Sequence, residues 1–87
     1  TREVMQKNNP LDLTFKEYEL LCMLIRERDR IIPREELLNV IWGFDFVGES
    51  RTLDIHVRTL RQKLGDDAEN PKYIKTVRNV GYRFIGE

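Results

Sequence analysis

The segment from residue 50 to residue 65, SRTLDIHVRTLRQKLG, constrains the fold most, because its apolar residues recur at a single helical spacing. On a helix that turns by about 100° per residue, four aliphatic side chains fall within one narrow sector: Leu53, Val57, Leu60 and Leu64. Such a sector has to be buried, so other parts of the chain must cover it. Ser50 suits the N-cap, and Gly65 suits the residue after the end. The pattern therefore predicts a helix over 51–64.

Two amphipathic segments earlier in the chain can supply that cover. Thr14 and Glu17 have capping-box spacing, which predicts that a helix begins there. Pro33 suits a first helical turn and Gly43 suits the left-handed residue after a helix end, which predicts a second helix over 34–42. Apolar residues recur at helical spacing in both segments and form the predicted core: Leu20, Leu21, Leu24 and Ile25 in the first, and Leu37, Leu38, Ile41 and Trp42 in the second.

Short β-like runs precede the helices. Residues 2–7 and 11–14 are separated by the turn-forming sequence NNP at 8–10, which favours a small hairpin. Residues 43–50, GFDFVGES, carry two glycines and no helical period, so a loop is expected to lead into the third helix.

A second hairpin is predicted at the C-terminal end. The runs YIKTVR and YRFIG flank Asn79-Val80-Gly81, in which Asn and Gly both tolerate positive φ. Tyr82 and Phe84 lie on one side of the last strand, and their rings are expected to pack under the third helix. The order hairpin, three helices, hairpin is an α+β fold, and 87 residues suffice for one small domain with a modest core.

The charge is balanced overall but unevenly distributed. The chain has 15 basic and 15 acidic residues. Residues 51–64 hold four basic side chains against Asp54 alone, and residues 72–87 hold four against Glu87 alone, so each segment carries +3. Ordinary solvated surface and a directed basic face are both compatible with this distribution.

The face of the third helix opposite its apolar ridge surrounds one aliphatic residue, Ile55, with polar groups: Arg51, Asp54, Arg58 and Gln62, with Arg61 at one margin and Thr59 at the other. Single exposed apolar side chains are common, so Ile55 alone decides nothing. Alternatively, this face enters a DNA major groove, where an aliphatic group packs on a thymine methyl while arginines and an amide reach phosphates and base edges.

Two charged residues have more than one interpretation. Asp54 fits a DNA-binding face if it accepts from a cytosine amino group or orients a neighbouring arginine, but a favourable interaction with the helix N-terminus is equally open. Arg78, at the tip of the C-terminal hairpin, can reach into a minor groove over an A·T tract, or it is an edge-strand cation that discourages aggregation.

Catalytic, metal-binding and membrane functions find little support. The one cysteine, Cys22, and the one histidine, His56, have no second Cys or His to complete a metal site, and nothing shows that they meet as a nucleophile and base. Cys22 is expected to be a small buried hydrophobe. The sequence has no glycine-rich loop of the kind that binds phosphates, so no cofactor is expected. Enzymatic activity is therefore not expected. No run approaches the ~20 apolar residues of a membrane span, so a cytosolic protein is expected. The first residue, Thr1, suggests a piece of a longer protein.

Four motifs carry a resemblance to a known family: LDLTFKEYELL, PREELLNVIWG, SRTLDIHVRTLRQKL and YIKTVRNVGYRF, in this order over residues 11–84. They resemble the winged-helix effector domain of the OmpR/PhoB class of bacterial two-component response regulators. The resemblance implies a transcription regulator that binds double-stranded DNA sequence-specifically, with the recognition helix 51–64 in the major groove and the C-terminal hairpin, the wing of residues 73–85, in the minor groove. It also implies that the N-terminal hairpin is the remnant of a four-stranded sheet, and that the first two strands of this sheet and the receiver domain lie outside this chain or have been lost.

Carried over by position, the resemblance implies individual DNA contacts. Phosphates would be held by Arg51, Arg58 and Arg61, and bases would face Asp54, Ile55 and Thr59. Thr52 would lie at the groove edge, Trp42 and Thr76 beside the DNA backbone, Arg78 in the minor groove and Tyr82 near a phosphate.

Three positions depart from the family pattern. Thr59 stands where some relatives have a base-reading arginine, so the target sequence cannot be copied from them. Pro33 stands where the second helix often opens with a capping serine or threonine. Asn79 replaces a common wing glycine, which preserves the turn only if it adopts the left-handed conformation.

The resemblance also implies partners. These are tandem direct repeats of DNA bound by a head-to-tail dimer, RNA polymerase through loop 43–50, and a sensor histidine kinase that acts on the receiver domain. The same fold binds proteins in other settings, so a protein-interaction module is the alternative. Such a module would not need a cationic stripe beside an exposed aliphatic residue on the third helix.

Overall fold

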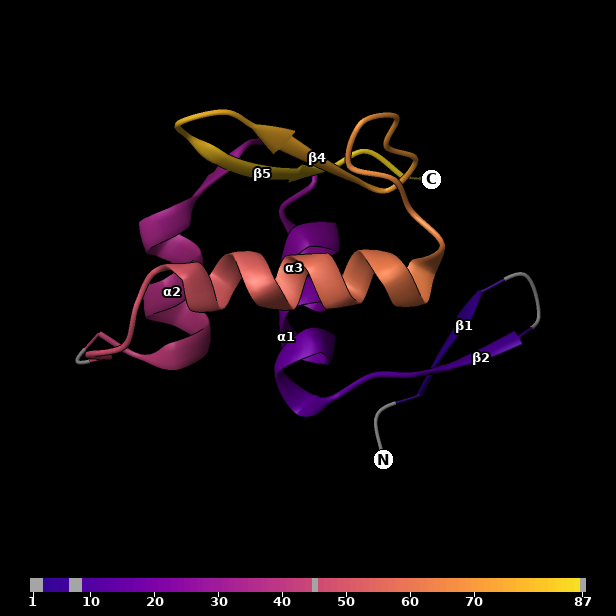
Figure 1. The fold of residues 1–87 in the computed structure, drawn as a ribbon, viewed down its shortest axis with the longest axis horizontal. Helices are drawn as coiled ribbons and strands as arrows, with labels where there is room; N and C mark the ends of the chain where they lie inside the picture. Colours follow the sequence, from indigo (N-terminus) through magenta and orange to yellow (C-terminus); the bar gives the residue numbers. More distant parts are fainter. Residues whose placement is uncertain (1–2, 7–8, 45, 87) are drawn as a thin grey trace.

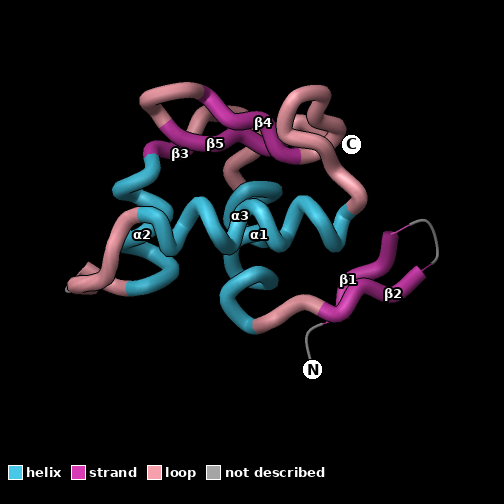
Figure 2. Tube along the Cα trace, in the orientation of Figure 1, coloured by secondary structure: helices cyan, strands magenta, loops and turns pink. Residues whose placement is uncertain are grey.

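The computed structural model describes residues 3–6, 9–44 and 46–86 and places three helices between β-strands (Figure 1). The elements are β1 (Glu3–Gln6), β2 (Asn9–Asp12), α1 (Phe15–Arg26), β3 (Ile32–Pro33), α2 (Arg34–Trp42), α3 (Arg51–Leu64), β4 (Ile74–Val77) and β5 (Gly81–Phe84). The α+β class, the three helices and the two hairpins are confirmed. Figure 2 shows the three-stranded sheet along one side of the helices, with the β1–β2 hairpin beyond the C-terminal end of α3.

The start of α1 follows the capping box. The Thr14 hydroxyl accepts from the Glu17 N–H at 3.2 Å, and the Glu17 carboxylate accepts from the Thr14 N–H at 2.9 Å. Together these bonds satisfy two of the N–H groups that a helix start leaves free, as predicted.

The starts of α2 and α3 differ from the predictions. Pro33 is extended and belongs to β3, so it is the N-cap of α2 and does not lie in the first turn. Ser50 occupies the predicted N-cap position of α3, but its side chain makes no capping hydrogen bond. Its backbone is already helical, and the N–H of Leu53 donates to its carbonyl at 3.2 Å. A backbone turn therefore replaces the expected side-chain cap.

The helix ends depend on glycine. Gly65 has φ 72° and ψ 30°, the predicted left-handed cap of α3. Gly43 follows α2 with φ 104° but ψ 154°, so it has positive φ without being left-handed helical. The chain leaves α2 in an extended direction there and enters the 43–50 loop.

The second sheet has the order β3-β5-β4, and all its neighbouring strands are antiparallel. The sequence did not predict β3, which pairs Ile32 with Tyr82 and Pro33 with Gly81. A Cβ atom on Gly81 would lie 1.9 Å from the carbonyl oxygen of Ile32, so this position needs glycine because two backbones approach closely. The expected positive φ is found at Asn79, with φ 67°, and not at Gly81.

The N-terminal hairpin has a different turn from the one predicted. Its register pairs Gln6 with Asn9 and Met5 with Pro10. Asn9 and Pro10 therefore belong to strand β2, which ends at Asp12, and they do not form the connection. The remaining turn positions, residues 7 and 8, lie outside the described residues.

The core lies between the three helices and the β3-β5-β4 sheet. The four ridge residues of α3 are all buried, as predicted, and so are Tyr82 and Phe84 of β5 beneath them. Ile25 is exposed at the end of α1, so its assignment to the core was wrong, and Trp42 is only half-buried. Met23 is buried instead, because the inner face of α1 includes that position.

Candidate nucleic-acid interface

One stripe of α3 faces solvent, and Arg51 at its start donates a hydrogen bond to the exposed carboxylate of Glu49 at 3.3 Å. The stripe consists of Arg51, Ile55, Arg58 and Gln62, all exposed, at alternating spacings of four and three residues. Residues at these spacings stack along one side of a helix. Ile55, at the centre of the stripe, is 58 % exposed. We call these four residues the α3 stripe; the β4–β5 hairpin lies alongside the same helix in Figure 1.

Asp54 points away from the α3 stripe and joins three elements. Its Oδ1 accepts hydrogen bonds from the Nη1 of Arg34, at the start of α2, and from the hydroxyl of Tyr82 on β5. Burial opposes ionisation of Asp54, but these two bonds outweigh it and hold its pKa below the ordinary value. Of the interpretations open from sequence, the geometry matches pairing with an arginine.

The hydroxyl of Tyr82 is engaged inside the domain. Its ring is buried, and burial together with the Asp54 carboxylate raises its pKa to about 12. The hydroxyl therefore remains protonated and donates to Asp54. The phosphate contact expected for Tyr82 would require this bond to break.

Arg61 also turns toward the wing. Its Nη2 donates to the carbonyl oxygen of Ile74 at 2.8 Å and to the hydroxyl of Thr76 at 2.7 Å, and its guanidinium lies 5.9 Å from the Tyr82 ring centroid. These contacts join Arg61 on α3 directly to Ile74 and Thr76 on β4. The helical wheel located Arg61 at the margin of the face, but it could not show that the side chain reaches a strand.

Thr59 lies on the side of α3 that faces α1. Its hydroxyl donates to Oε2 of Glu17 at 2.7 Å, and Lys63 donates to Oε1 of the same carboxylate at 2.6 Å. Glu17 is only 3 % exposed. Burial alone would raise its pKa, but the bonds from Lys63, Thr59 and the Thr14 N–H lower it to about 2. The structure therefore does not bring Thr59 together with the α3 stripe.

Trp42 and His56 hold the loop after α2 against α3. The two rings pack edge to face with centroids 4.9 Å apart, and Phe46 lies 6.2 Å from the Trp42 ring. His56 Nδ1 is 2.8 Å from the carbonyl oxygen of Thr52, which fixes the imidazole along its own helix. Both Trp42 and Thr52 are half-buried beside the start of α3.

Arg78 occupies the exposed turn of the wing. Residues 78–80 connect β4 to β5, and the turn is closed by the N–H of Val80 donating to the carbonyl of Val77 at 3.0 Å. Asn79 adopts the left-handed conformation that its replacement of glycine requires. The sequence-predicted position of Arg78 at the hairpin tip is confirmed.

A groove of about 380 Å³ lies at the C-terminal end of the α3 stripe. It is lined by Arg58, Arg61 and Gln62 on one side and by residues 66–68 on the other. Asp66 accepts from the N–H groups of Lys72 and Ile74 at 2.7 and 2.9 Å; these bonds outweigh its burial and keep its pKa low. Asp66 thus holds the acidic loop in its conformation through hydrogen bonds to the backbone. The charge pattern of the sequence did not reveal this role.

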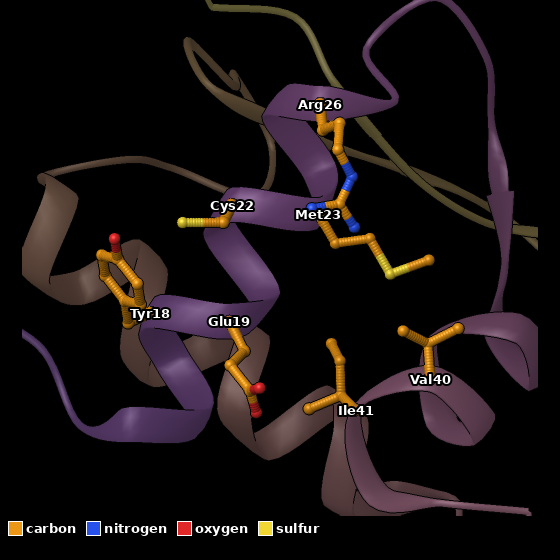
Figure 3. Close-up of a pocket in the computed structure, with 7 residues that line it drawn as sticks. All are labelled: Tyr18, Glu19, Cys22, Met23, Arg26, Val40 and Ile41. Carbon is orange, nitrogen blue, oxygen red and sulfur yellow. The ribbon is translucent and has the colours of Figure 1, made fainter.

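A second cavity of about 150 Å³ lies between α1 and α2, away from this face (Figure 3). The side chains of Met23 and Arg26 extend from α1 toward Val40 of α2, and Cys22, half-buried, lines the same space. Within the described parts of the chain, no group of three potential ligands is placed to hold a metal ion. None of the described helices is long and apolar enough to cross a membrane.

Comparison with known proteins agrees with this geometry. A family model described as "Transcriptional regulatory protein, C terminal" matches residues 8–84. The chain is 42 % identical over 86 residues to the sensory transduction protein RegX3 of Mycolicibacterium smegmatis, a match that covers 98 % of this chain and 38 % of RegX3. The chain therefore spans well under half of that relative's length.

Two solved structures share the fold. The RstA DNA-binding domain of Klebsiella pneumoniae, in complex with the RstA box, has a TM-score of 0.86 at 36 % identity, covering 95 % of this chain and 82 % of that one. DrrB of Thermotoga maritima, described as an OmpR/PhoB homologue, has a TM-score of 0.86 at 33 % identity, covering 97 % of this chain and 38 % of that one. The chain therefore belongs to the family of transcriptional regulatory protein C-terminal domains and is a winged-helix DNA-binding domain of the OmpR/PhoB response-regulator class.

Proposed function

We propose that this domain is the effector part of a two-component response regulator and reads double-stranded DNA by placing α3 in the major groove. The observation that carries the proposal is the α3 stripe, where Ile55 is exposed between two arginines and an amide. These are the groups that contact thymine methyls, phosphates and base edges. The RstA domain, which shares the fold, was solved with its DNA box.

We divide the sequence-predicted contact residues, apart from Arg78, into three sets. We assign phosphate contacts to Arg51 and Arg58 and base contacts to Ile55 and Gln62, because all four are exposed on one side of α3. The residues of the second set make hydrogen bonds inside the fold and help to hold α3 in position: Asp54, Thr59, Arg61, Thr76 and Tyr82. Half-buried Thr52 and Trp42 are assigned to the edge of the groove.

The wing extends this interface to the minor groove. Arg78 is exposed in the turn between β4 and β5, on the hairpin that Arg61 fastens to α3. A narrow A·T-rich minor groove has a strong negative potential that attracts an inserted arginine. We therefore propose that α3 and residue 78 contact adjacent grooves of one site.

The partners of the whole protein are proposed from the family resemblance. We propose tandem direct repeats bound by a head-to-tail dimer, and a receiver domain, controlled by a sensor histidine kinase, elsewhere in the whole protein. The loop 43–50 is proposed to contact RNA polymerase. Its support is the exposure of Phe44 at 86 % and Val47 at 98 %, since apolar groups so exposed favour a protein partner.

The Arg58→Ala variant is expected to weaken all duplexes to a similar degree. A phosphate contact carries no sequence information, and its loss removes about one unit from the slope of log K against log salt. Fluorescence anisotropy with a preferred and a scrambled duplex at several salt concentrations measures both quantities. A loss confined to the preferred duplex would show that Arg58 reads a base instead.

The Arg78→Ala variant is expected to lose preference for A·T pairs beside the α3 site, by about tenfold in relative affinity. Binding-site selection from random duplexes, with wild type and variant in parallel, gives the preference at each position. An unchanged selection profile would count against a minor-groove role for the wing.

Retention on duplex DNA tests the function as a whole. At ~50 mM salt the domain should shift a random duplex, and the shift should disappear as salt rises. Selection on random duplexes then supplies the consensus and the half-site spacing. A domain that leaves duplex DNA unshifted at low salt would favour the protein-interaction alternative.

A further inference from the structure

Arg34 connects the wing to the start of the recognition helix, although no sequence pattern pointed to a functional role for it. Its backbone N–H donates to the carbonyl of Val80, in the wing turn, at 3.1 Å. Its side chain reaches the opposite way, where Nη1 binds Asp54 and Nη2 donates to the carbonyl of Ser50 at 3.1 Å. One residue therefore bonds the turn that carries Arg78 and the first turn of α3.

Tyr82 completes this connection from the strand that follows the turn. Its hydroxyl donates to the same Asp54 oxygen that accepts from Arg34. Its position is fixed by its buried ring and by strand pairing with Ile32, two residues before Arg34. The close approach of Gly81 to the Ile32 carbonyl leaves little freedom in that pairing. We call Arg34, Asp54 and Tyr82 the wing clamp.

Arg34 and Asp54 form the charged part of the wing clamp, and each favours the ionised state of the other. The hydrogen bond from Arg34 lowers the pKa of Asp54 against its burial, and the bond to Asp54 raises the pKa of Arg34, so both groups stay ionised near neutral pH. A charge-assisted hydrogen bond is stronger than a neutral one. In the free domain the Arg34 guanidinium is therefore engaged with Asp54 and with the carbonyl of Ser50.

We propose that Arg34 is a positioning residue that sets the wing turn relative to α3, and so fixes the distance between the bases read by the α3 stripe and the minor-groove contact of Arg78. This inference rests on the proposed DNA-binding function. It assigns Asp54 and Tyr82 to the same task, in place of the base and phosphate contacts that the family resemblance implied. The wing clamp therefore affects specificity without touching DNA.

The Arg34→Gln variant tests the proposal, with Arg30→Gln as the matched control. Arg30 lies four residues earlier and has the same charge, but its side chain pairs with Glu27 and Glu36 instead of with α3. In Arg34→Gln, preference for the A·T pairs beside the α3 site should fall about tenfold, the usual cost of one disturbed base-pair contact. The salt slope should stay at the wild-type value. In Arg30→Gln both quantities should match wild type.

A measurement without DNA separates positioning from contact. Residual dipolar couplings of backbone amides in the free domain report whether α3 and the β4–β5 hairpin share one fixed orientation. We expect one alignment tensor to fit both elements in wild type and in Arg30→Gln, and to fail in Arg34→Gln. Tyr82→Phe keeps the buried ring and removes only the hydroxyl, so it should change the couplings and the A·T preference in the same direction even if Arg34→Gln is too unstable to study.

The possible results are distinguishable. A salt slope that falls by about one unit in Arg34→Gln would show that Arg34 touches a phosphate and would overturn the proposal. Unchanged couplings together with an unchanged A·T preference in both clamp variants would also overturn it. If wild type itself binds no duplex DNA, the proposed function fails, whereas wild-type binding with insensitive clamp variants refutes the positioning role alone.

Discussion

Replacing Ile55 by aspartate is expected to weaken binding to the preferred duplex on the order of 100-fold while the domain stays folded. Ile55 is 58 % exposed at the centre of the α3 stripe. In a major groove, the substitution would remove the contact between Ile55 and a thymine methyl. It would also bring a carboxylate close to phosphates of the same charge. Because more than half of the Ile55 side chain is exposed in the free domain, the free energy of unfolding should change by less than ~1 kcal/mol.

Val40→Asp is the matched control for this change. Val40 is 56 % exposed on α2 and lines the α1–α2 cavity, away from the α3 stripe. The substitution adds the same charge to a similarly exposed branched side chain, so it reproduces any effect of net charge alone. Anisotropy should give Val40→Asp an affinity within a few-fold of wild type. Equal losses in the two variants would mean that the stripe has no special role.

The Glu17→Gln variant is expected to lower the free energy of unfolding at pH 7 by about 2 kcal/mol. Glutamine can still close the capping box, but it leaves Lys63 without its carboxylate partner. Breaking a fully buried ion pair costs ~3–5 kcal/mol, and the cost is smaller here because Lys63 keeps part of its hydration. Urea unfolding of wild type and variant measures the difference.

The same carboxylate gives stability a defined pH dependence. Glu17 has a pKa of about 2 in the folded state against an ordinary value of 4.5. Its stabilisation is therefore complete above pH 4.5 and is lost as the pH falls toward 2. Glu17→Gln should remove this part of the acid sensitivity and leave the parts due to Asp54 and Asp66, whose pKa values are also lowered.

Glu19→Gln serves as the control for that measurement. Glu19 lies on the same helix and pairs with Lys16 at 3.7 Å across two partly exposed side chains. Exposed ion pairs contribute less than ~1 kcal/mol, so this variant should keep nearly wild-type stability and acid sensitivity. If the two variants had the same free energy of unfolding and the same acid sensitivity, the bonds from Glu17 of α1 to Thr59 and Lys63 of α3 would not stabilise the domain.

The parts of the fold that follow from periodicity were predictable. The ridge of α3 could be assigned from Leu53 to Leu64 because four aliphatic residues repeat at helical spacing, and all four are buried. The exposure of Ile55 follows from the same pattern. The capping box at Thr14 was predictable for a related reason, since its two hydrogen bonds join residues three positions apart.

The parts that depend on long side chains were not predictable. A helical wheel places the Cα atom of Arg61, but its guanidinium lies on the wing, and Thr59 reaches Glu17, 42 residues away in the sequence. Arg34 received no role because its partners come from the start of α3 and from the wing turn, far away in the sequence. Strand β3 has only two residues, so its existence depends on pairing with β5 and leaves no alternation to detect.

Whether α3 reads the DNA can be measured by titrating the isotopically labelled domain with a duplex that carries its selected site and following the backbone amide chemical shifts. The largest chemical-shift changes are expected on residues 51–62 of α3 and on residues 78–80 of the wing turn. Amides around Val40 and the α1–α2 cavity should stay close to their free positions. Large shifts around that cavity, with the amides of the α3 stripe unchanged, would contradict the assignment of α3 as the DNA-reading element.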